Sequence, residues 1–487
     1  MDIRKSLVFS YLDRYASLII NIVSSMVIAR MLTPADIGVF SVTVVLLTFI
    51  ASIRDMGAGN YLVQEKEITI DRVRAVWAVQ LGLGVLLALV VLAASVPVAL
   101  FYKEPRMRDI MLVVALNYAI NPFGSLTYAW QIREMRFDAL AIVRFSATLA
   151  GAVVSIVCAW RGYGPISLAY GSLASTTVNA AMAVHYRPAW FPWLPGIKEI
   201  RRVLAFGSQT TGAAVIQNIA GNAPELLLAK LQSMTATGLY SRASGLILMF
   251  ERLVLAGIGA VAVSWFAKQS RDHGDIAQPF IKATSYICAI GIAFSLGTIF
   301  LAHSAMRVLY GPQWDGAIEL TRLLAVALAF SLPASMCNAA LMATGGASRV
   351  LRGTAVTTVI AVILVTIGAY GGLTQMGVCL IISSAFRTIY WLQQTRAALG
   401  FAWSDLGSAV WKSTLVGMGA GVAPLLVYCI FGALPANIWW PLVFGVPGAF
   451  IGFVAMSTLV KHPIQEEISS ALALIKQMVL RFVAKFQ

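Results

Sequence analysis

Long apolar stretches alternate with short polar ones along the whole chain. The apolar runs reach about 20 residues or more, the length of an α-helix that crosses a hydrocarbon core of roughly 30 Å. Because backbone amides in lipid must be satisfied within their own segment or in a closed barrel, runs of this length predict helices and no strands. The expected spans are 7–29, 37–63, 75–101, 109–131, 139–160, 164–185, 203–229, 237–266, 277–303, 316–342, 354–372, 376–395, 408–433 and 438–460. The pattern predicts an all-α membrane protein of about fourteen transmembrane helices.

Lysine and arginine residues are distributed unevenly between the predicted spans. The loops and adjoining span ends on the side of the N-terminus hold 22 of the 36, those on the opposite side hold seven, and the remaining seven lie within spans. Positively charged loops stay in the cytoplasm, so both termini are expected there and the number of spans should be even. After residue 461 apolar and basic positions alternate as in an amphipathic helix that lies on the cytoplasmic membrane surface.

Composition agrees with lipid as the solvent, since 59% of the residues are apolar and 12% are charged. The net charge of +15 does not indicate a nucleic-acid partner, because the basic residues are scattered between apolar runs. The first run contains Asp13 and Arg14 and lacks a small-residue cleavage site, so we expect a retained helix and no signal peptide. The five cysteines and four histidines are isolated, which predicts no disulfide, metal site or cofactor.

Two parts of the chain resemble each other at an offset of 200 residues. Residues 29–31 align with 229–231, and residues 38–41 (GVFS) align with 238–241 (GLYS). Repeats that are six spans apart keep the same orientation and are related by an axis along the membrane normal. We therefore predict two six-helix lobes related by pseudo-two-fold symmetry, plus two extra C-terminal helices. The expected boundaries are 1–195 and 196–398 for the lobes, 399–460 for the extra helices and 461–487 for the cytoplasmic tail.

Polar and charged side chains inside the predicted spans are the candidate binding groups. A charge at a helix centre costs about 2.5 to 3.5 kcal/mol, so such residues normally face a polar interior. Polar residues recur at helical spacing on the first, second, seventh and eighth spans, which predicts a shared central cavity. The expected cavity residues are Arg14, Asn21, Arg54, Asn218, Glu225, Arg242 and Arg252, and the acids Asp13, Asp55 and Glu251 are expected to form ion pairs or to act in gating.

The candidate arginines allow two interpretations. An arginine in a dry cavity binds a phosphate through bidentate, charge-assisted hydrogen bonds, which favours an anionic substrate. Internal ion pairs that hold helices together explain the same charges, and small residues on these spans also serve close helix packing. We find no catalytic motif and no phosphate-binding loop, and the loops are short, so the chain is not expected to be an enzyme.

The sequence resembles the Wzx-type polysaccharide transporters, also called oligosaccharide flippases, of the superfamily that includes multidrug extruders and lipid II flippases. The resemblance is carried by residues 29–64, 206–246 and 309–324, and Gly162-Tyr163-Gly164 followed by Ser167-Leu168 is similar to the colanic-acid-exporter branch. It implies a two-lobed transporter that flips undecaprenyl-pyrophosphate-linked repeat units across the bacterial inner membrane by alternating access, for exopolysaccharide, capsule or O-antigen.

The resemblance also implies roles for individual residues. Lipid II flippases use cavity arginines on the first, second and eighth spans, and Arg14, Arg54 and either Arg242 or Arg252 are similarly placed here. Family members often have Asp in the seventh span where this chain has Glu225. The implied partners are a lipid-linked oligosaccharide and the bilayer. A monomer is expected, and association with a polysaccharide polymerase is left open.

Two alternatives remain. A multidrug antiporter of the same fold would need acidic cation-binding residues and little arginine. An integral-membrane polymerase or glycosyltransferase would usually have a large periplasmic loop, whereas no loop here is expected to exceed about twenty residues on boundaries good to about ±2 to 4 residues.

Overall fold

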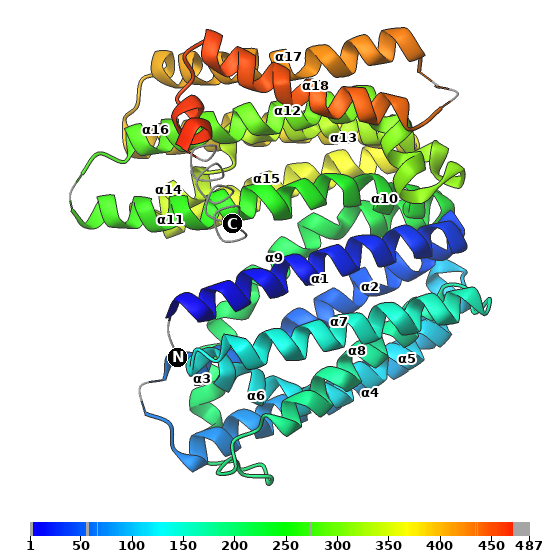
Figure 1. The fold of residues 1–487 in the computed structure, drawn as a ribbon. Coiled ribbons are helices and arrows are strands. Elements are labelled where there is room, and N and C mark those ends of the chain that lie inside the picture. Colours follow the sequence, from blue (N-terminus) through cyan, green and yellow to red (C-terminus); the bar gives the residue numbers. More distant parts are fainter. Residues whose placement is uncertain are drawn as a thin grey trace, which may run out of the picture. The chain divides into compact units, whose positions relative to one another are not determined.

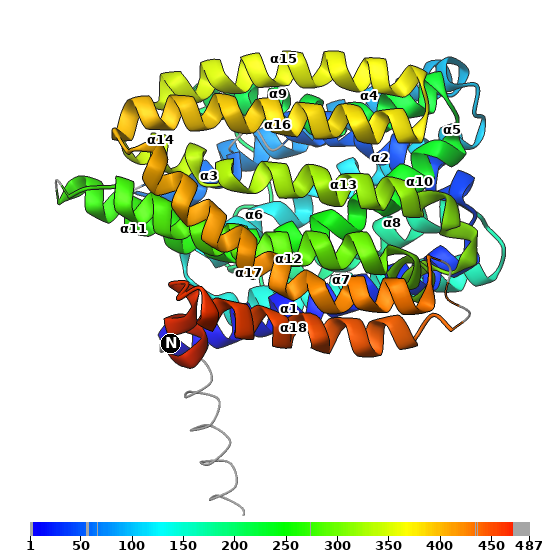
Figure 2. The ribbon, with the colours of Figure 1, turned by 90° about the horizontal axis from the view of Figure 1, so that it is seen from above.

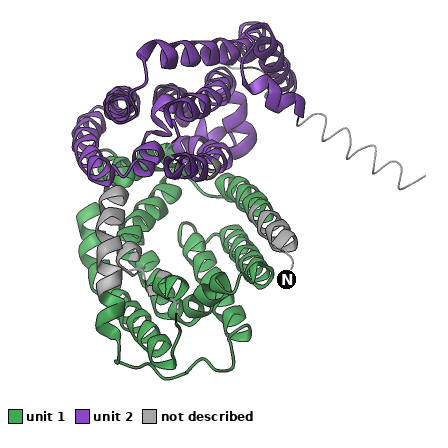
Figure 3. Cartoon of the chain, turned by 90° about the vertical axis from the view of Figure 1, so that its left-hand side faces the viewer, with its two compact units in different colours: residues 1–241 green, residues 242–487 purple. Residues whose placement is uncertain are grey.

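The computed structural model describes residues 3–54, 58–65, 67–272, 274–433, 435 and 437–470, without the side chains of 3–14, 51–54, 58, 60, 205–220, 256, 260, 261 and 267. Every regular element in these residues is a helix, as Figure 1 shows. The all-α prediction is therefore confirmed. The chain divides into two compact units, residues 1–241 and 242–487 (Figure 3). The predicted lobe boundary near residue 195 concerns sequence repeats and stays a prediction.

Unit 1 is built from long helices joined by short turns. Its helices α7 and α8 pack against each other, α4 packs on α5, and α9 packs on α2 and α4. Its elements are α1 (Ile3–Met31), α2 (Pro34–Arg54), α3 (Ala58–Gln64), α4 (Ile70–Tyr102), α5 (Arg106–Ile120), α6 (Pro122–Arg133), α7 (Phe137–Trp160), α8 (Ile166–His185), α9 (Ile200–Leu231) and the first turns of α10 (Met234–Phe250).

Unit 2 is also helical, and its helix α12 packs against α13 and α17. The helices α17 and α18 run side by side, which both Figure 1 and Figure 2 show. Its elements are the rest of α10, the π-helix η1 (Glu251–Leu255), α11 (Ala256–Arg271), α12 (Ala277–Tyr310), the 3₁₀-helix η2 (Pro312–Ala317), α13 (Ile318–Ser331), the 3₁₀-helix η3 (Leu332–Ala334), α14 (Cys337–Ala343), α15 (Ala347–Tyr370), α16 (Leu373–Leu399), α17 (Trp403–Phe431) and α18 (Trp440–Leu459).

Large apolar side chains lie on the outside of the helices as well as inside. In α4, Val91 is fully buried while Leu100 is 72% exposed, and Trp160 and Leu459 at the ends of α7 and α18 are similarly exposed. Only a lipid environment accommodates such a surface without cost. Within the described residues, nine helical stretches are long and apolar enough to cross a membrane, or ten if one bent pair counts as a single span. The count of fourteen stays a prediction, although each predicted span overlaps a helix.

Several predicted spans are interrupted. The span expected over 109–131 consists of α5 and α6, which meet at an angle of 50°. Pro122 is the first residue of α6 and cannot donate a backbone hydrogen bond to the preceding turn, which explains the bend. The span expected over 316–342 contains the 3₁₀ turn at Pro333, and the span over 237–266 contains the π-helix.

The two sequence repeats begin their second helix in the same way. Thr33 precedes α2, and its hydroxyl accepts a hydrogen bond from the Asp36 amide at 3.2 Å, while the Asp36 carboxylate accepts from the Thr33 amide at 3.1 Å. Ser233 precedes α10, and its hydroxyl accepts from the Ala236 amide at 3.1 Å. Both residues satisfy helix N–H groups that have no intrahelical partner. Thr33 and Ser233, which are 200 residues apart, thus precede equivalent helices of the two repeats.

Candidate functional site

The structure places about half of the predicted site residues. The side chains of Asp13, Arg14, Arg54 and Asn218, and the whole of Asp55, lie outside the described residues, so their predicted roles stay predictions. Asn21 lies on α1 with an exposed side chain, and its amide Nδ2 donates to the Ser17 carbonyl one turn earlier at 2.8 Å. One N–H donor of the Asn21 amide is therefore already hydrogen-bonded within α1.

Glu225 lies at the centre of a hydrogen-bonded cluster in unit 1, which we call the serine–glutamate cluster and which comprises Ser41, Glu225 and Ser241. The Ser41 hydroxyl donates to the Glu225 carboxylate at 2.6 Å, and Ser241 also hydrogen-bonds this carboxylate. The two serine oxygens are 3.1 Å apart. Ser41 and Ser241 are equivalent residues of the two repeats, so one acid on α9 joins the beginnings of α2 and α10.

The same helix beginnings touch at their backbones. A Cβ atom on Gly38 would lie 1.8 Å from the Met234 carbonyl oxygen, and a Cβ on Gly238 would lie 1.8 Å from the Pro34 carbonyl oxygen. Carbonyl oxygens of the backbone cannot move aside, so only glycine fits at both positions. The two glycines are again 200 residues apart, and together with the serine–glutamate cluster they form a symmetric crossing of α2 and α10.

An ionic cluster holds the beginning of α2 against the turn between α4 and α5. The Arg106 guanidinium donates to both Glu104 oxygens, at 2.8 and 2.9 Å, and to the Asp36 carboxylate at 2.7 Å. These hydrogen bonds, with the positive charge of Arg106, hold the pKa of Glu104 below its usual value. The cluster therefore fixes the end of α2 that carries Gly38 and Ser41.

In unit 2, the Arg242 guanidinium lies against two aromatic rings. Its guanidinium carbon is 5.4 Å from the Tyr310 ring centre and 5.6 Å from that of Trp314, and Trp314 is fully buried. Such cation–π contacts orient the plane of the guanidinium group, in which all its N–H donors lie. The sequence predicted Arg242 as a binding residue but gave no role to these rings. Both rings lie within residues 309–324, one of the stretches that carry the family resemblance, and this was the only sequence signal that could have pointed to them.

Glu251 and Arg252 lie in the π-helix between α10 and α11. The Glu251 carboxylate interacts electrostatically with Arg387 of α16 as well as with Arg252. Glu251 thus interacts with arginines on two segments, and its predicted role in an ion pair or in gating stays a prediction. The Arg252 side chain is exposed, and π-helical turns of this kind are frequent at functional sites.

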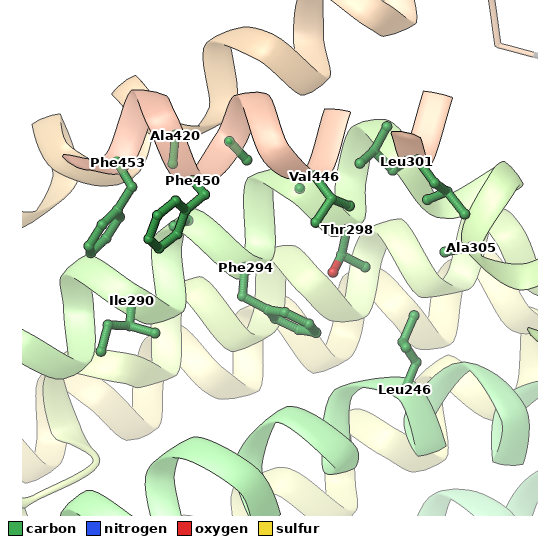
Figure 4. A pocket seen from close by; sticks show the side chains of 14 residues that line it. Leu246, Ile290, Phe294, Thr298, Leu301, Ala305, Ala420, Val446, Phe450 and Phe453 are labelled. Carbon is green, nitrogen blue, oxygen red and sulfur yellow. The ribbon is translucent and has the colours of Figure 1, made fainter. Parts of the chain in front are cut away.

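An apolar cavity of about 520 Å³ lies beside Arg242 in unit 2, between α10, α12, α17 and α18 (Figure 4). Leu246, Phe294, Phe450 and Phe453 are among the side chains that line it. Leu246 follows Arg242 by four residues on α10, so the two lie on one helix face about 6 Å apart along the axis. Phe450 is 63% exposed, which puts one wall of the cavity at the surface of the unit. No pattern in the sequence marks this cavity, because its lining comes from four helices rather than from one segment of the chain.

Metal binding and disulfide chemistry have no site in the part of the chain that the structure describes. No group of three His, Cys, Asp or Glu residues there is arranged to hold a metal ion. All five cysteines are free, and Cys288 and Cys337 are buried. The described candidate groups are therefore binding groups. They are a carboxylate with two hydroxyls in unit 1, and an arginine against aromatic rings and an apolar cavity in unit 2.

The architecture is similar to that of solved flippases and extruders. A structure titled lipid II flippase MurJ, inward closed conformation, matches 95% of this chain and 100% of its own chain with a TM-score of 0.75 at 14% identity. A multidrug resistance MATE family transporter of the MOP superfamily, in an inward-facing conformation, matches 79% of this chain and 96% of its own with a TM-score of 0.61 at 13% identity. At these identities the likeness shows the fold alone.

Sequence comparison adds a family. Similar proteins include the succinoglycan biosynthesis transport protein ExoT of Rhizobium meliloti, 24% identical over 67% of this chain and 66% of its own length, and the lipopolysaccharide biosynthesis protein WzxC of Escherichia coli, 22% identical over 63% of each. An uncharacterized membrane protein in the cps region of Klebsiella pneumoniae is 23% identical over 70% of each. These alignments span about two thirds of the relatives' length. The family model described as polysaccharide biosynthesis protein matches residues 27–319. This multi-pass bacterial membrane protein therefore belongs to the polysaccharide biosynthesis protein family.

Proposed function

We propose that the chain is a flippase that carries lipid-linked oligosaccharides from the cytoplasmic to the periplasmic leaflet of the inner membrane by alternating access. The names of its relatives, a succinoglycan transport protein and a lipopolysaccharide biosynthesis protein, support a polysaccharide pathway. The proposal that the substrate is linked to a lipid is supported by the position of Arg242, one helical turn from Leu246 in the cavity lining. A positive donor and an apolar cavity at this spacing suit an anionic headgroup joined to a long apolar chain.

The chemistry of each part supports this assignment. Arginine presents a planar fork of N–H donors that matches phosphate oxygens, and the Tyr310 and Trp314 rings orient that plane. The cavity wall of Leu, Ile, Val and Phe side chains offers dispersion contacts and little to a hydrated ligand. An isoprenoid chain with a pyrophosphate group would satisfy both. Arg14, Arg54 and Arg252 remain proposed as further contacts of the pyrophosphate, and Asn21, Asn218 and Glu225 as further cavity residues.

Alternating access requires that one end of the transport path opens while the other closes. We propose that the crossing of α2 and α10 at Gly38 and Gly238 is a closed gate, and that the serine–glutamate cluster holds it shut. The predicted topology puts this crossing at the periplasmic end. Breaking two hydrogen bonds to one carboxylate would release both helices together, and this supports a role of Glu225 in gating as well as in binding.

Export by a strain that lacks its own flippase tests the function. The chain should restore surface polysaccharide, and lipid-linked repeat units should not accumulate in the cytoplasmic leaflet. In R242A we expect the export rate to fall about tenfold or more, because hydrogen bonds to charged groups contribute about 1.5 to 3 kcal/mol. R242K should recover part of the rate, since lysine keeps the charge and loses the fork.

Arg352 supplies the matched control, because it is an exposed arginine at the beginning of α15. R352A should export normally at equal membrane abundance. Failure of the wild-type chain to restore export while it confers resistance to cationic drugs would favour the antiporter alternative. Normal export by an abundant R242A variant would remove Arg242 from the proposed site.

A further inference from the structure

Unit 1 contains a cavity that is separate from the apolar cavity of unit 2 and has no role in the proposed function so far. It has a volume of about 220 Å³ and lies between α2, α5 and α8. Its polar lining comes from Thr48, Asn117, Asn121, Ser172 and Thr176. None of its described lining residues carries a formal charge. A phosphate or an organic cation would find no counter-charge there, so the ligand that fits is neutral.

The hydrogen-bond directions show what kind of neutral ligand. The Thr48 and Thr176 hydroxyls donate to carbonyl oxygens four residues earlier in their own helices, at 2.9 and 3.0 Å. A hydroxyl has one proton and two lone pairs, so both oxygens can offer only lone pairs to the cavity through these contacts. These two side chains therefore act as acceptors toward the cavity, and a ligand that hydrogen-bonds them must bring donors.

Asn117 is the clearest case. Its Nδ2 donates to the Ser172 hydroxyl oxygen at 2.9 Å, whereas its Oδ1 is buried and has no hydrogen-bond partner among the described residues. Buried amide oxygens are nearly always satisfied, because leaving one without a donor is unfavourable. Asn117 is one of the residues that line the cavity, so a ligand hydroxyl bound there could supply the donor that Oδ1 lacks.

Two aromatic side chains complete the lining. The Tyr118 hydroxyl donates to the Leu47 carbonyl oxygen at 2.7 Å, which fixes the ring, and Phe40 adds a second ring. Sugars present hydroxyl donors at their rim and C–H bonds on their faces, so acceptors beside aromatic rings suit a pyranose. A bare monovalent cation would also bind neutral oxygen ligands. However, the side chains of Phe40, Val44 and Val114 supply no oxygen atom, and the cavity is large for a single ion.

We propose that this cavity, the α2–α5–α8 pocket, binds one sugar residue of the transported oligosaccharide. The proposal rests on the proposed function, since it names the part of the substrate that unit 1 recognises. Selectivity among sugars would then depend on which ring hydroxyls reach Asn117 and the two threonines.

The test is saturation-transfer NMR on the purified full-length chain in nanodiscs, with D-glucose, D-galactose, D-mannose and N-acetylglucosamine as probes at millimolar concentration. We expect ring protons of at least one sugar to receive saturation. The effect should fall about fivefold in N117L and in T176V, the factor expected for one lost neutral hydrogen bond.

Thr177 gives a matched control. It is the next residue on α8, its hydroxyl donates to the Leu173 carbonyl oxygen in the same way, and its side chain is exposed and outside the pocket. T177V should therefore bind sugar as the wild type does. Absence of saturation transfer from all four sugars, or equal signals in N117L, T176V and T177V, would overturn the proposal. So would sodium-dependent stabilisation that T176V abolishes, which would assign the pocket to a cation.

Export assays separate this proposal from the proposed function. If the wild-type chain restores export and the N117L and T176V variants export the same repeat unit at the wild-type rate, the pocket is not a glycan site although the flippase function stands. If the wild-type chain does not restore export, the proposed function fails. Reduced export in both variants, with normal export in T177V, supports both proposals.

Discussion

His462 shows how a single buried side chain anchors the chain after α18. Its Nε2 is 2.8 Å from the Ser285 hydroxyl oxygen on α12 and 3.0 Å from the Ser413 hydroxyl oxygen on α17. Its Nδ1 accepts a hydrogen bond from the Ile464 amide at 3.2 Å. Since Nδ1 accepts, the proton of the neutral ring is on Nε2 and is donated to one of the serines. A second proton on Nδ1 would break the contact with Ile464.

The pH dependence of stability follows from this arrangement. Burial, with a smaller effect of the positive charge of Lys412, lowers the pKa of His462 from 6.5 to about 4. The unfolded chain therefore binds a proton at this residue between about pH 6.5 and 4 while the folded chain does not, so the folded state loses stability as pH falls through that window. We expect the melting temperature in detergent to fall from pH 7.5 to pH 5 and the fall to be smaller in H462Q.

The histidine control is His185, which is exposed at the end of α8. H185Q makes the same substitution away from the buried His462 contacts, so it reports any effect of the substitution itself. Carboxylates also titrate near pH 5, so the difference between the two variants is the informative quantity. Identical pH profiles for H462Q and the wild type would show that His462 does not contribute.

Individual residues also show where sequence reasoning stops. Spacing along the spans singled out Glu225 and Arg242, because charges in apolar segments are visible without coordinates. Spacing could not identify Ser41 or Trp314 as their partners, since such contacts depend on how distant helices pack. His462 was described only as isolated, because its partners lie 49 and 177 residues away in the sequence.

At the scale of elements, the crossing of α2 and α10 depends on two glycines. In G238A the new methyl group would lie against the Pro34 carbonyl oxygen, so the helices must separate or the variant must rearrange. Overpacking of this kind typically costs about 1 to 3 kcal/mol. We expect G238A to melt at a lower temperature in detergent and to export poorly.

Gly245 is the control on the same helix, because a Cβ there meets no atom within 4 Å. G245A should be neutral or slightly more stable, since alanine favours helix over glycine by about 1 kcal/mol. Equal melting temperatures for G238A and G245A would contradict the close crossing. A G238A variant that folds normally but exports poorly would place the effect in gating.

Elements could be predicted from the sequence where a local residue pattern marks them. The starts of α2 and α10 were predictable, because Thr33-Pro34 and the repeat offset mark them directly. The bend at Pro122 was also marked by its proline, although the span over 109–131 was treated as straight. The π-helix at Glu251 has no such marker, because its extra residue per turn follows from packing and not from a local sequence signal.

At the scale of the whole molecule, the distribution of positive charge predicts the orientation in the membrane. Apolar runs alternate with loops whose positive charges fall mainly on one side, which predicts that both termini are cytoplasmic. Reporter fusions should report cytoplasm after each site on that side, namely Lys66, Arg136, Arg202, Arg271, Arg349 and Gln487. Fusions after Gly162, Gly311 and Gly371, which follow α7, α12 and α15, should report periplasm.

The fusions test the span count together with the orientation, because each predicted span reverses the side of the next loop. A single missed or added span would invert every reporter beyond it and leave those before it unchanged. Periplasmic signals at two or more of the cytoplasmic sites would therefore overturn the fourteen-span model and locate the error between the last normal and the first inverted site. A fully alternating pattern would also put the crossing of α2 and α10 on the periplasmic side, as the proposed gate requires.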